Sequence, residues 1–399
     1  MWNLSKEVKE SYRKYNLLPI HETDQDWETT LREAKEEGED LIGQLKEELE
    51  DVKEELLDVL PSRFIQYVEN GTLNQPTLPK TVREDYLQWM GTKEKEFEEI
   101  LDAANAQTLE AVTYLPAEVQ NIFEESLHDS TIERIERTNH TLHLYINTDG
   151  GFSSKSLIHF IFQDVLDEIS DEPLQVGQWL IYNELKKTED GFAFRVLFDC
   201  PSAEWTIKMK NLDAKYYYRP VTYTRLSDEG ALDEISFAEY VAQLNRKHHH
   251  WLITPHLTCE IRSFSENRHL ENGKLEFREN EFVVTNGKSS FVYQLDEYNP
   301  VHFIYTDVYE DPYGHLNEQV PIDKIEAAIF SDELELQVRA WNTLYANAEE
   351  LADIINQVLW KMTITEENEM MLHAYTSHFY KEGLLTEPNI KKYRIFLNS

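Results

Sequence analysis

Residues 179–198, WLIYNELKKTEDGFAFRVLF, decide the fold of this chain. Two runs rich in aliphatic and aromatic residues flank a short polar segment, and Asp190-Gly191 supplies the residue types that tight hairpin turns favour. The stretch therefore predicts an antiparallel β-hairpin. Further strand-like runs lie before and after it, at 131–136, 141–147, 156–162 and 204–212. Five or six strands joined by short turns predict an antiparallel sheet.

The residues that precede this sheet predict helices. Apolar residues recur every three or four positions, which puts them on one face of a helix: Leu41, Leu45, Leu49, Val52 and Leu56. Thr23 with Asp26 three residues later predicts a helix cap, and Pro61 predicts a helix end. A second amphipathic helix is expected over 81–109. The fold class is therefore α+β, with a helical N-terminal region packed on the antiparallel sheet.

The C-terminal half has its own mixture of patterns. A polar, acidic connection at 224–234 is the best candidate for a domain boundary. Residues 237–245 predict a helix, and strand-like runs follow it at 257–264, 273–284, 290–295 and 302–309. Residues 324–341 are expected to form another hairpin, with one long helix as the alternative. Asn347 and Glu350 resemble a capping box that opens the first of the C-terminal helices.

These patterns divide the chain into three regions. Residues 1–125 are expected to form an acidic helical region, and residues 126–222 form the antiparallel sheet that completes the N-terminal domain. Residues 223–399 are expected to form a second α+β domain, with antiparallel strands followed by C-terminal helices.

The charge of the chain limits its partners. It carries 75 acidic and 38 basic residues, a formal net charge of −37. Such a surface repels nucleic acid and anionic lipid, so we expect neither nucleic acid nor a membrane as a partner, and a basic protein partner instead. Two cysteines are no disulfide framework, and no apolar run is long enough for a secretory signal or a membrane span. We therefore expect a cytoplasmic protein.

Four stretches carry a resemblance to a known family. They are LPIHETDQDWETT at 18–30, DVLPSRFIQYVENGTLN at 58–74, ESLHDSTI at 125–132 and the segment 179–207 that contains the hairpin. Through them the region from about 1 to 215 resembles an uncharacterised bacterial family, the domain of unknown function 4085. The resemblance implies a cytoplasmic protein of low-GC Gram-positive type bacteria. It implies no activity.

The densest group of metal-binding residue types lies at 245–260, NRKHHHWLITPHLTCE. Consecutive histidines on a helix point about 100° apart and cannot all reach one ion. The remaining candidate set is His250, His256 and Cys259, which could supply three ligands for a divalent metal such as zinc. The favoured interpretation is a helix end, where Arg246, Lys247 and the histidines complement the negative end of the helix dipole.

Three other features could carry chemistry, and each has a simpler structural interpretation. His128-Asp129 has the sequence seen in metal-dependent phosphohydrolases, but it lies where helix gives way to strand. The segment 306–315 gathers Asp307, Glu310, Asp311 and His315, although Asp-Pro-Tyr-Gly is ordinary turn chemistry. Cys200 has no neighbouring base that would activate it. The familiar phosphate-binding, zinc-protease and nucleophile-elbow motifs are absent from the sequence.

These observations favour a non-enzymatic protein-binding protein, of which an inhibitor or immunity-type protein that neutralises a basic partner is the sharpest version. No cofactor is expected, apart from the divalent metal that His250, His256 and Cys259 could bind. A metal-dependent hydrolase is the first alternative. A scaffold that self-associates through its acidic helices is the second.

Overall fold

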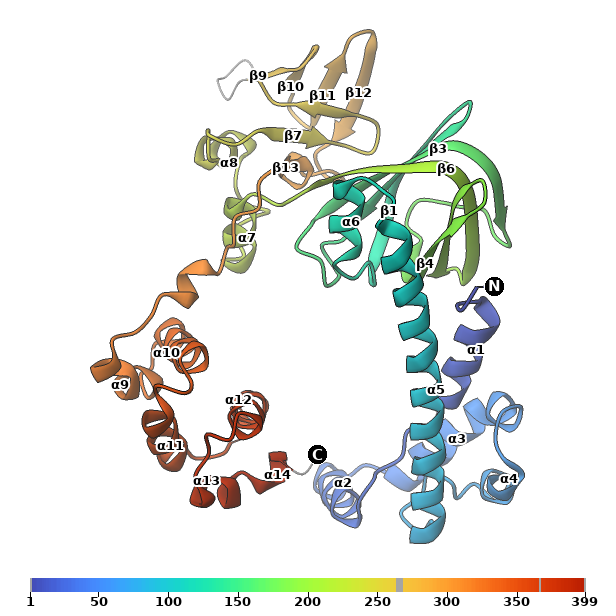
Figure 1. The fold of residues 1–399 in the computed structure, drawn as a ribbon, viewed down its shortest axis with the longest axis vertical. Helices are drawn as coiled ribbons and strands as arrows, with labels where there is room; N and C mark the ends of the chain where they lie inside the picture. The colour runs from blue at the N-terminus through green and yellow to red at the C-terminus, as the bar shows by residue number, and fades with distance from the viewer. Residues whose placement is uncertain (1, 263–267, 366, 398–399) are drawn as a thin grey trace. The chain divides into compact units, whose positions relative to one another are not determined.

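The computed structural model describes residues 2–262, 268–365 and 367–397 (Figure 1). The chain forms two compact units. The first contains Met1–Thr222 and Ala231–Tyr309, and the second contains Tyr223–Gly230 and Glu310–Ser399. Helices precede an antiparallel sheet, further antiparallel sheets follow, and helices end the chain, so the predicted α+β class is confirmed.

The first unit opens with six helices: α1 (Lys6–Tyr15), α2 (Asp24–Glu37), α3 (Leu41–Leu57), α4 (Ser62–Glu69), α5 (Lys80–Val112) and α6 (Ala117–Phe123). The predicted cap is present, because the Thr23 side chain accepts from the Asp26 backbone and Asp26 accepts from the Thr23 backbone. The apolar stripe of α3 buries Leu49 and Leu56 against aromatic residues of α4 and α5. The long α5 confirms the second predicted helix.

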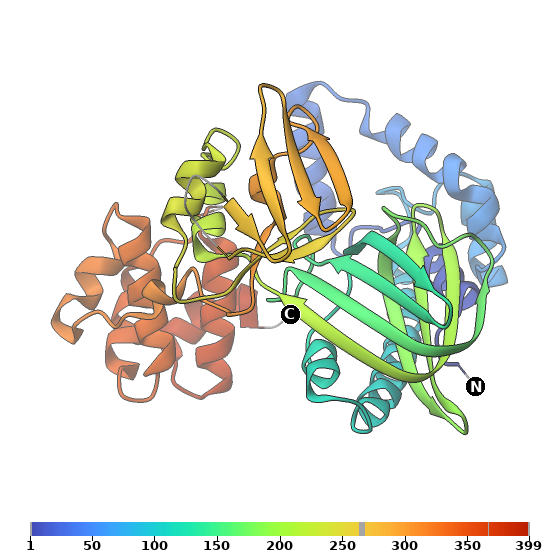
Figure 2. The same cartoon turned by 90° about the horizontal axis from the view of Figure 1, so that it is seen from above.

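The predicted sheet closes into a barrel of six strands, β1 (Ser130–Thr138), β2 (Thr141–Asn147), β3 (Leu157–Ser170), β4 (Trp179–Thr188), β5 (Gly191–Asp199) and β6 (Ala203–Tyr217). Its strand order is β1-β2-β3-β6-β5-β4, and Figure 2 shows the strands curving around their core. The hairpin predicted over 179–198 is the pair β4–β5, whose last ladder pair is Thr188 with Gly191. Closure rests on a short ladder, in which Ser130 faces Leu180 and Thr131 faces Trp179.

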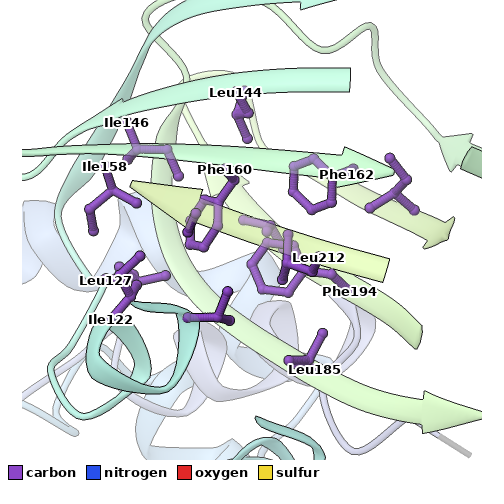
Figure 3. Close-up of a cluster of buried hydrophobic side chains, with 14 of the residues drawn as sticks. Ile122, Leu127, Leu144, Ile146, Ile158, Phe160, Phe162, Leu185, Phe194 and Leu212 are labelled. Atoms are coloured by element: carbon purple, nitrogen blue, oxygen red, sulfur yellow. The ribbon is translucent and has the colours of Figure 1, made fainter. Parts of the chain in front are cut away.

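The barrel interior is filled by side chains (Figure 3). Phe160, Phe162, Phe194 and Trp205 are fully buried there and pack ring against ring. Phe123 of α6 reaches the same cluster, with its ring centre 5.9 Å from Phe160 and 5.8 Å from Phe194. The interior is therefore a packed core, so a binding site is expected on the surface of the barrel.

Residues 231–309 form a smaller structure on the barrel. This smaller structure begins with α8 (Phe237–Gln243). One sheet has the order β13-β7-β8, and the other has the order β12-β11-β10-β9. Their bounds are β7 (His250–Ile253), β8 (Thr258–Glu260), β9 (Arg268–Leu270), β10 (Gly273–Phe277), β11 (Glu281–Asn286), β12 (Ser289–Gln294) and β13 (Ile304–Thr306), and η1 (Pro300–Phe303) precedes β13.

Two features attach this smaller structure to the barrel. Just beyond β6, Tyr218 exchanges two backbone hydrogen bonds with Thr306, of 2.8 and 2.9 Å, so the barrel strand continues into the β13 sheet. Below that junction, a buried apolar cluster joins Tyr145, Leu157 and Tyr217 of the barrel to Ile253 and Tyr305. Because of these contacts, 231–309 belongs to the same compact unit as the N-terminal half, whereas the sequence patterns group it with the C-terminal helices.

The second unit is helical in its described residues: α7 (Val221–Asp228), η2 (Gly314–Asn317), η3 (Ile322–Lys324), α9 (Ile325–Ile329), α10 (Leu334–Ala346), α11 (Ala352–Lys361), α12 (Glu369–Lys381), α13 (Glu387–Lys392) and α14 (Arg394–Leu397). The first two residues of α7 belong to the first unit.

The hairpin predicted over 324–341 is wrong, because α9 and α10 occupy that segment. Their apolar residues Ile325, Ile329, Trp341 and Leu344 all enter one helical core, and a short apolar run fits either period. The predicted capping box is also wrong. Asn347 closes α10, its side-chain amide donating to the Thr343 carbonyl at 2.9 Å, and α11 begins only at Ala352.

Candidate functional site

The histidine cluster does not end a helix, so that interpretation is wrong. The α8 helix ends at Gln243, and Leu244 already has an extended backbone. His249 lies in the turn that follows, 3.3 Å from the Glu260 carboxylate, and His250 opens β7 with 1% of its surface exposed. Pairing of β7 with both β8 and β13 decides this local structure, and a helical pattern cannot report it.

The predicted metal set is not gathered around one point. His256 has Nδ1 3.0 Å from the Tyr293 hydroxyl and stacks on Phe291. Cys259 is buried and accepts a hydrogen bond from the Asn286 side-chain amide at 3.0 Å, and burial raises the pKa of its thiol. Across the described residues, no three His, Cys, Asp or Glu side chains lie close enough to share a metal ion. His250, His256 and Cys259 therefore hold separate structural positions.

Three of the other candidate residues, His128, Asp311 and His315, have structural partners. His128 Nδ1 is 3.0 Å from the Asp129 carboxylate, in the turn just before β1. Asp311 accepts from the Tyr313 backbone amide at 2.9 Å, which is turn chemistry, and His315 is 3.8 Å from Glu335. Cys200 is exposed just beyond the end of β5.

A pocket of about 940 Å³ lies between the outer side of the barrel and the segment 231–309, within the first unit. Outward-facing residues of β1 and β2 form one wall. The start of α8, the turn after β7 and the segment Leu295–Tyr305 form the others. A pocket of this size holds a drug-sized ligand or a short peptide segment. It is the candidate functional site of the first unit.

Arg134 forms part of the barrel wall of the pocket. Its guanidinium donates to the Thr254 carbonyl at 2.8 Å and to the Thr258 hydroxyl at 2.7 Å, and its Nε lies 3.1 Å from the Glu136 carboxylate. The same guanidinium lies over the Tyr145 ring, 3.6 Å from its centre. These bonds attach the turn after β7 to the barrel. The positive charge of Arg134 is compensated by groups within the wall.

Arg219 attaches another segment of the wall in the same way, where the barrel meets β13. Its Nε and Nη2 donate to the Asp149 carboxylate at 2.9 and 2.7 Å, and its Nη1 donates to the His302 carbonyl at 2.7 Å. It lies over the Tyr305 ring, 4.2 Å from the centre. Both arginines of the wall are thus neutralised by carboxylates, Glu136 and Asp149, that do not line the pocket.

The remaining charge of the lining is negative. Four carboxylates line the pocket: Glu133, Asp233, Asp296 and Glu297. Glu133 accepts from the Asn147 amide at 2.9 Å, and Asp233 lies 3.2 Å from His302 Nε2. Asp296 and Glu297 are exposed and have no basic side chain within ion-pair distance among the residues described. The lining also carries aromatic rings, those of Tyr145, Phe237, Phe277, Tyr298, Phe303 and Tyr305.

The aliphatic hydroxyl groups of the lining have structural roles. The two aliphatic hydroxyls of the lining are engaged in structural hydrogen bonds: Ser236 donates to Glu239 at 2.6 Å, and Thr254 accepts from the Tyr293 hydroxyl at 2.7 Å. Ser236 and Glu239 together form the capping box of α8. Carboxylates beside aromatic faces, by contrast, are the groups that recognise an organic cation.

Sequence reasoning missed this pocket because its residues are far apart in the chain. One signal was available. Arg134 lies inside a run of strand residues, and its buried guanidinium takes two of its partners, Thr254 and Thr258, from outside that strand.

None of the helices in the described part of the chain is both long and apolar enough to cross a membrane. No curated protein and no solved structure matches the chain. The model of the family described as "Protein of unknown function (DUF4085)" matches residues 6–209, just over half of the chain, which spans α1 to α6 and nearly all of the barrel. The chain therefore belongs to the DUF4085 family of proteins of unknown function.

Proposed function

We propose that this protein is a non-enzymatic cytoplasmic binding protein whose partner is a basic protein, with an inhibitor or immunity-type protein as the sharpest form of the idea. The observation that carries the proposal is a surplus of unpaired carboxylates on the α2–α3 segment. Residues 21–58 contain sixteen acidic and four basic residues. Only Asp24, Glu50, Glu55 and Asp58 of the sixteen have a basic side chain within ion-pair distance in the described part of the chain.

The unpaired carboxylates of this segment all carry negative charge and attract a basic protein jointly. Their potentials add at short range and raise the rate at which a basic protein meets this surface. The Debye length is about 8 Å at physiological ionic strength, so salt weakens the attraction between exposed groups. A partner held in this way should be retained at low salt and released at high salt.

The experiment is a pull-down with the purified full chain from a lysate of the source cells. Binding is compared at about 50 mM and about 500 mM salt, which shortens the Debye length roughly threefold. The test variant replaces four exposed carboxylates of the segment by glutamine: Glu33, Glu36, Glu47 and Glu48. The control makes the same change in net charge in the second unit, at Glu349, Glu350, Glu367 and Glu382.

The proposal expects a basic protein that the wild type retains at low salt and loses at high salt. The test variant should retain much less of it, and the control should behave as the wild type does. Two results contradict the proposal. Either no basic protein is retained at low salt, or both variants lose the partner equally, in which case net charge alone produces the binding.

A further inference from the structure

We infer that the pocket between the barrel and 231–309 receives a lysine or arginine side chain, presented by a short extended segment of the protein partner. This inference rests on the proposed function for the source of the cation, but it names a separate site. The α2–α3 surface would attract the partner, and the pocket would select one basic residue of it.

The first argument is the sign of the charge that the pocket leaves available. An arginine in a pocket wall would ordinarily suggest an anionic ligand. Here the Arg219 guanidinium already donates two hydrogen bonds to Asp149 and one to the His302 carbonyl. The Arg134 guanidinium donates to Thr254 and Thr258 and lies beside the Glu136 carboxylate. The charges of the lining that remain available to a ligand are those of carboxylates.

The second argument is where those carboxylates lie. Asp296 and Glu297 follow β12 directly and are exposed, so a partner can reach them. Glu133 lies on the barrel wall, where it accepts a hydrogen bond from the neutral Asn147 amide. Among the described residues the lining includes no lysine. An incoming ammonium or guanidinium group therefore meets acceptors on two walls.

The third argument is the apolar part of the wall. Phe237 and Phe277 lie with ring centres 5.1 Å apart, and Tyr298 and Phe303 lie 6.0 Å apart. Rings of this kind cover the methylene stem of a lysine or arginine and attract its charged end through their faces. Such a wall favours an organic cation with an aliphatic stem over a bare metal ion, which needs several oxygen ligands around one point.

The fourth argument is size. About 940 Å³ is more room than one side chain needs, and it suits a short peptide that carries a basic residue. A free polyamine would offer the same ammonium chemistry without a peptide backbone. The peptide is the occupant to which the inference commits, because the partner proposed for this protein is a basic protein.

The experiment is calorimetric titration of the full chain with acetylated, amidated pentapeptides. The probes have the sequence Ala-Ala-X-Ala-Ala, in which X is lysine, arginine, glutamine or glutamate, and spermidine is titrated separately. The test variant is D296N/E297Q, which alters two exposed side chains. The control variant E172Q/E189Q makes the same change in charge at two exposed barrel residues that do not line the pocket.

The lysine and arginine peptides should bind the wild type, and the glutamine and glutamate peptides should not. The test variant should bind the basic peptides about tenfold more weakly, since it loses two charge pairs at an accessible site. The control should match the wild type. A third variant, E133Q, should also weaken binding, which would place the cation between the two walls.

The remaining outcomes separate the two proposals. If the lysate yields a basic partner but D296N/E297Q retains it and binds the peptides unchanged, the pocket inference is overturned and the proposed function stands. If the peptides bind through the pocket but no basic protein is retained, the proposed function fails alone. Binding of spermidine without binding of either basic peptide would overturn the commitment to a peptide.

Discussion

The guanidinium of Arg134 lies 3.6 Å above the centre of the Tyr145 ring and is hydrogen-bonded to both ends of the turn that joins β7 to β8. We expect Arg134→Met to keep most of the packing but to leave the Thr254 carbonyl without this donor and Glu136 without its cation. The loss should be about 1–3 kcal/mol of local stability. Hydrogen exchange should become faster at 252–258 while the barrel interior stays protected.

The matched change for this test is Arg137→Met, because Arg137 lies on the same strand and forms an exposed pair with Glu168. An exposed pair contributes up to about 1 kcal/mol, so exchange in the turn after β7 should not change. If Arg134→Met leaves exchange at 252–258 as it was, the arginine does not anchor the pocket wall.

The Glu125–Lys155 pair should make the first unit sensitive to acid. Burial alone would raise the pKa of Glu125, but hydrogen bonds from Lys155, Ser153 and Ser154 outweigh it and lower the pKa to about 2. A depressed carboxyl pKa contributes stability above the ordinary value near 4.5, and that stability is lost as the pH falls through about 2.

Glu125→Gln should therefore lower the melting temperature clearly at pH 7 and much less at pH 2. The loss at pH 7 should be up to about 3 kcal/mol, because Lys155 is 2% exposed and would lose its charged partner. Glu124→Gln, at the exposed neighbouring position, is the control and should change little at either pH. Equal losses at the two pH values would refute the assignment.

Lys392 should be important to the second unit alone. Its ammonium donates to the Leu359 carbonyl at 2.8 Å, to the Trp360 carbonyl at 2.9 Å and to the Met362 carbonyl, at and just beyond the end of α11. Those groups have few other donors at a helix end. Lys392→Met should lower the free energy of unfolding of the second unit by about 1–3 kcal/mol. Calorimetry should show this as a lower transition temperature for that unit.

Lys391→Met is the control, because Lys391 is exposed and adjacent in sequence. The barrel transition should be unchanged in both variants, since Lys392 and its carbonyl partners all belong to the second unit. A shift of both transitions by Lys392→Met would mean that the units do not unfold independently.

Gly191 tests the hairpin that decides the fold. Its φ is +147°, and an added Cβ would lie 2.3 Å from the Met209 carbonyl oxygen on the next strand. Gly191→Ala should therefore destabilise the barrel by at least about 2 kcal/mol. Gly91→Ala, in the middle of α5 with open space around it, should instead stabilise by about 0.5–1 kcal/mol. Chemical denaturation followed by tryptophan fluorescence measures both.

The barrel strands could be predicted because their signal is local. Both strands are runs rich in aliphatic and aromatic residues, and Asp190-Gly191 marks the turn between them, so 179–198 was sufficient to place β4 and β5. Barrel closure could not be predicted in the same way. It depends on Ser130 and Thr131 meeting Leu180 and Trp179, about fifty residues later, and a strand pattern does not name its partner.

The errors have the same cause. The segment 324–341 alternates well enough for a strand, and only the tertiary core of the second unit selects two helices. The pocket needs Arg134, Arg219 and Asp296 together, and these lie in three distant stretches of sequence. The sequence pattern around His250 favours a helix end, whereas strand pairing places His250 at the start of β7.

The most direct test of the binding site is a hydrogen-exchange footprint on the full chain, with and without a saturating amount of the lysine pentapeptide. We predict slower exchange at 295–299 and in the turn at 254–257, which form neighbouring walls of the pocket, and no such change in D296N/E297Q at the same peptide concentration. Protection that appears only outside these segments, or equally in the wild type and the variant, would contradict the pocket as the site where the cation binds.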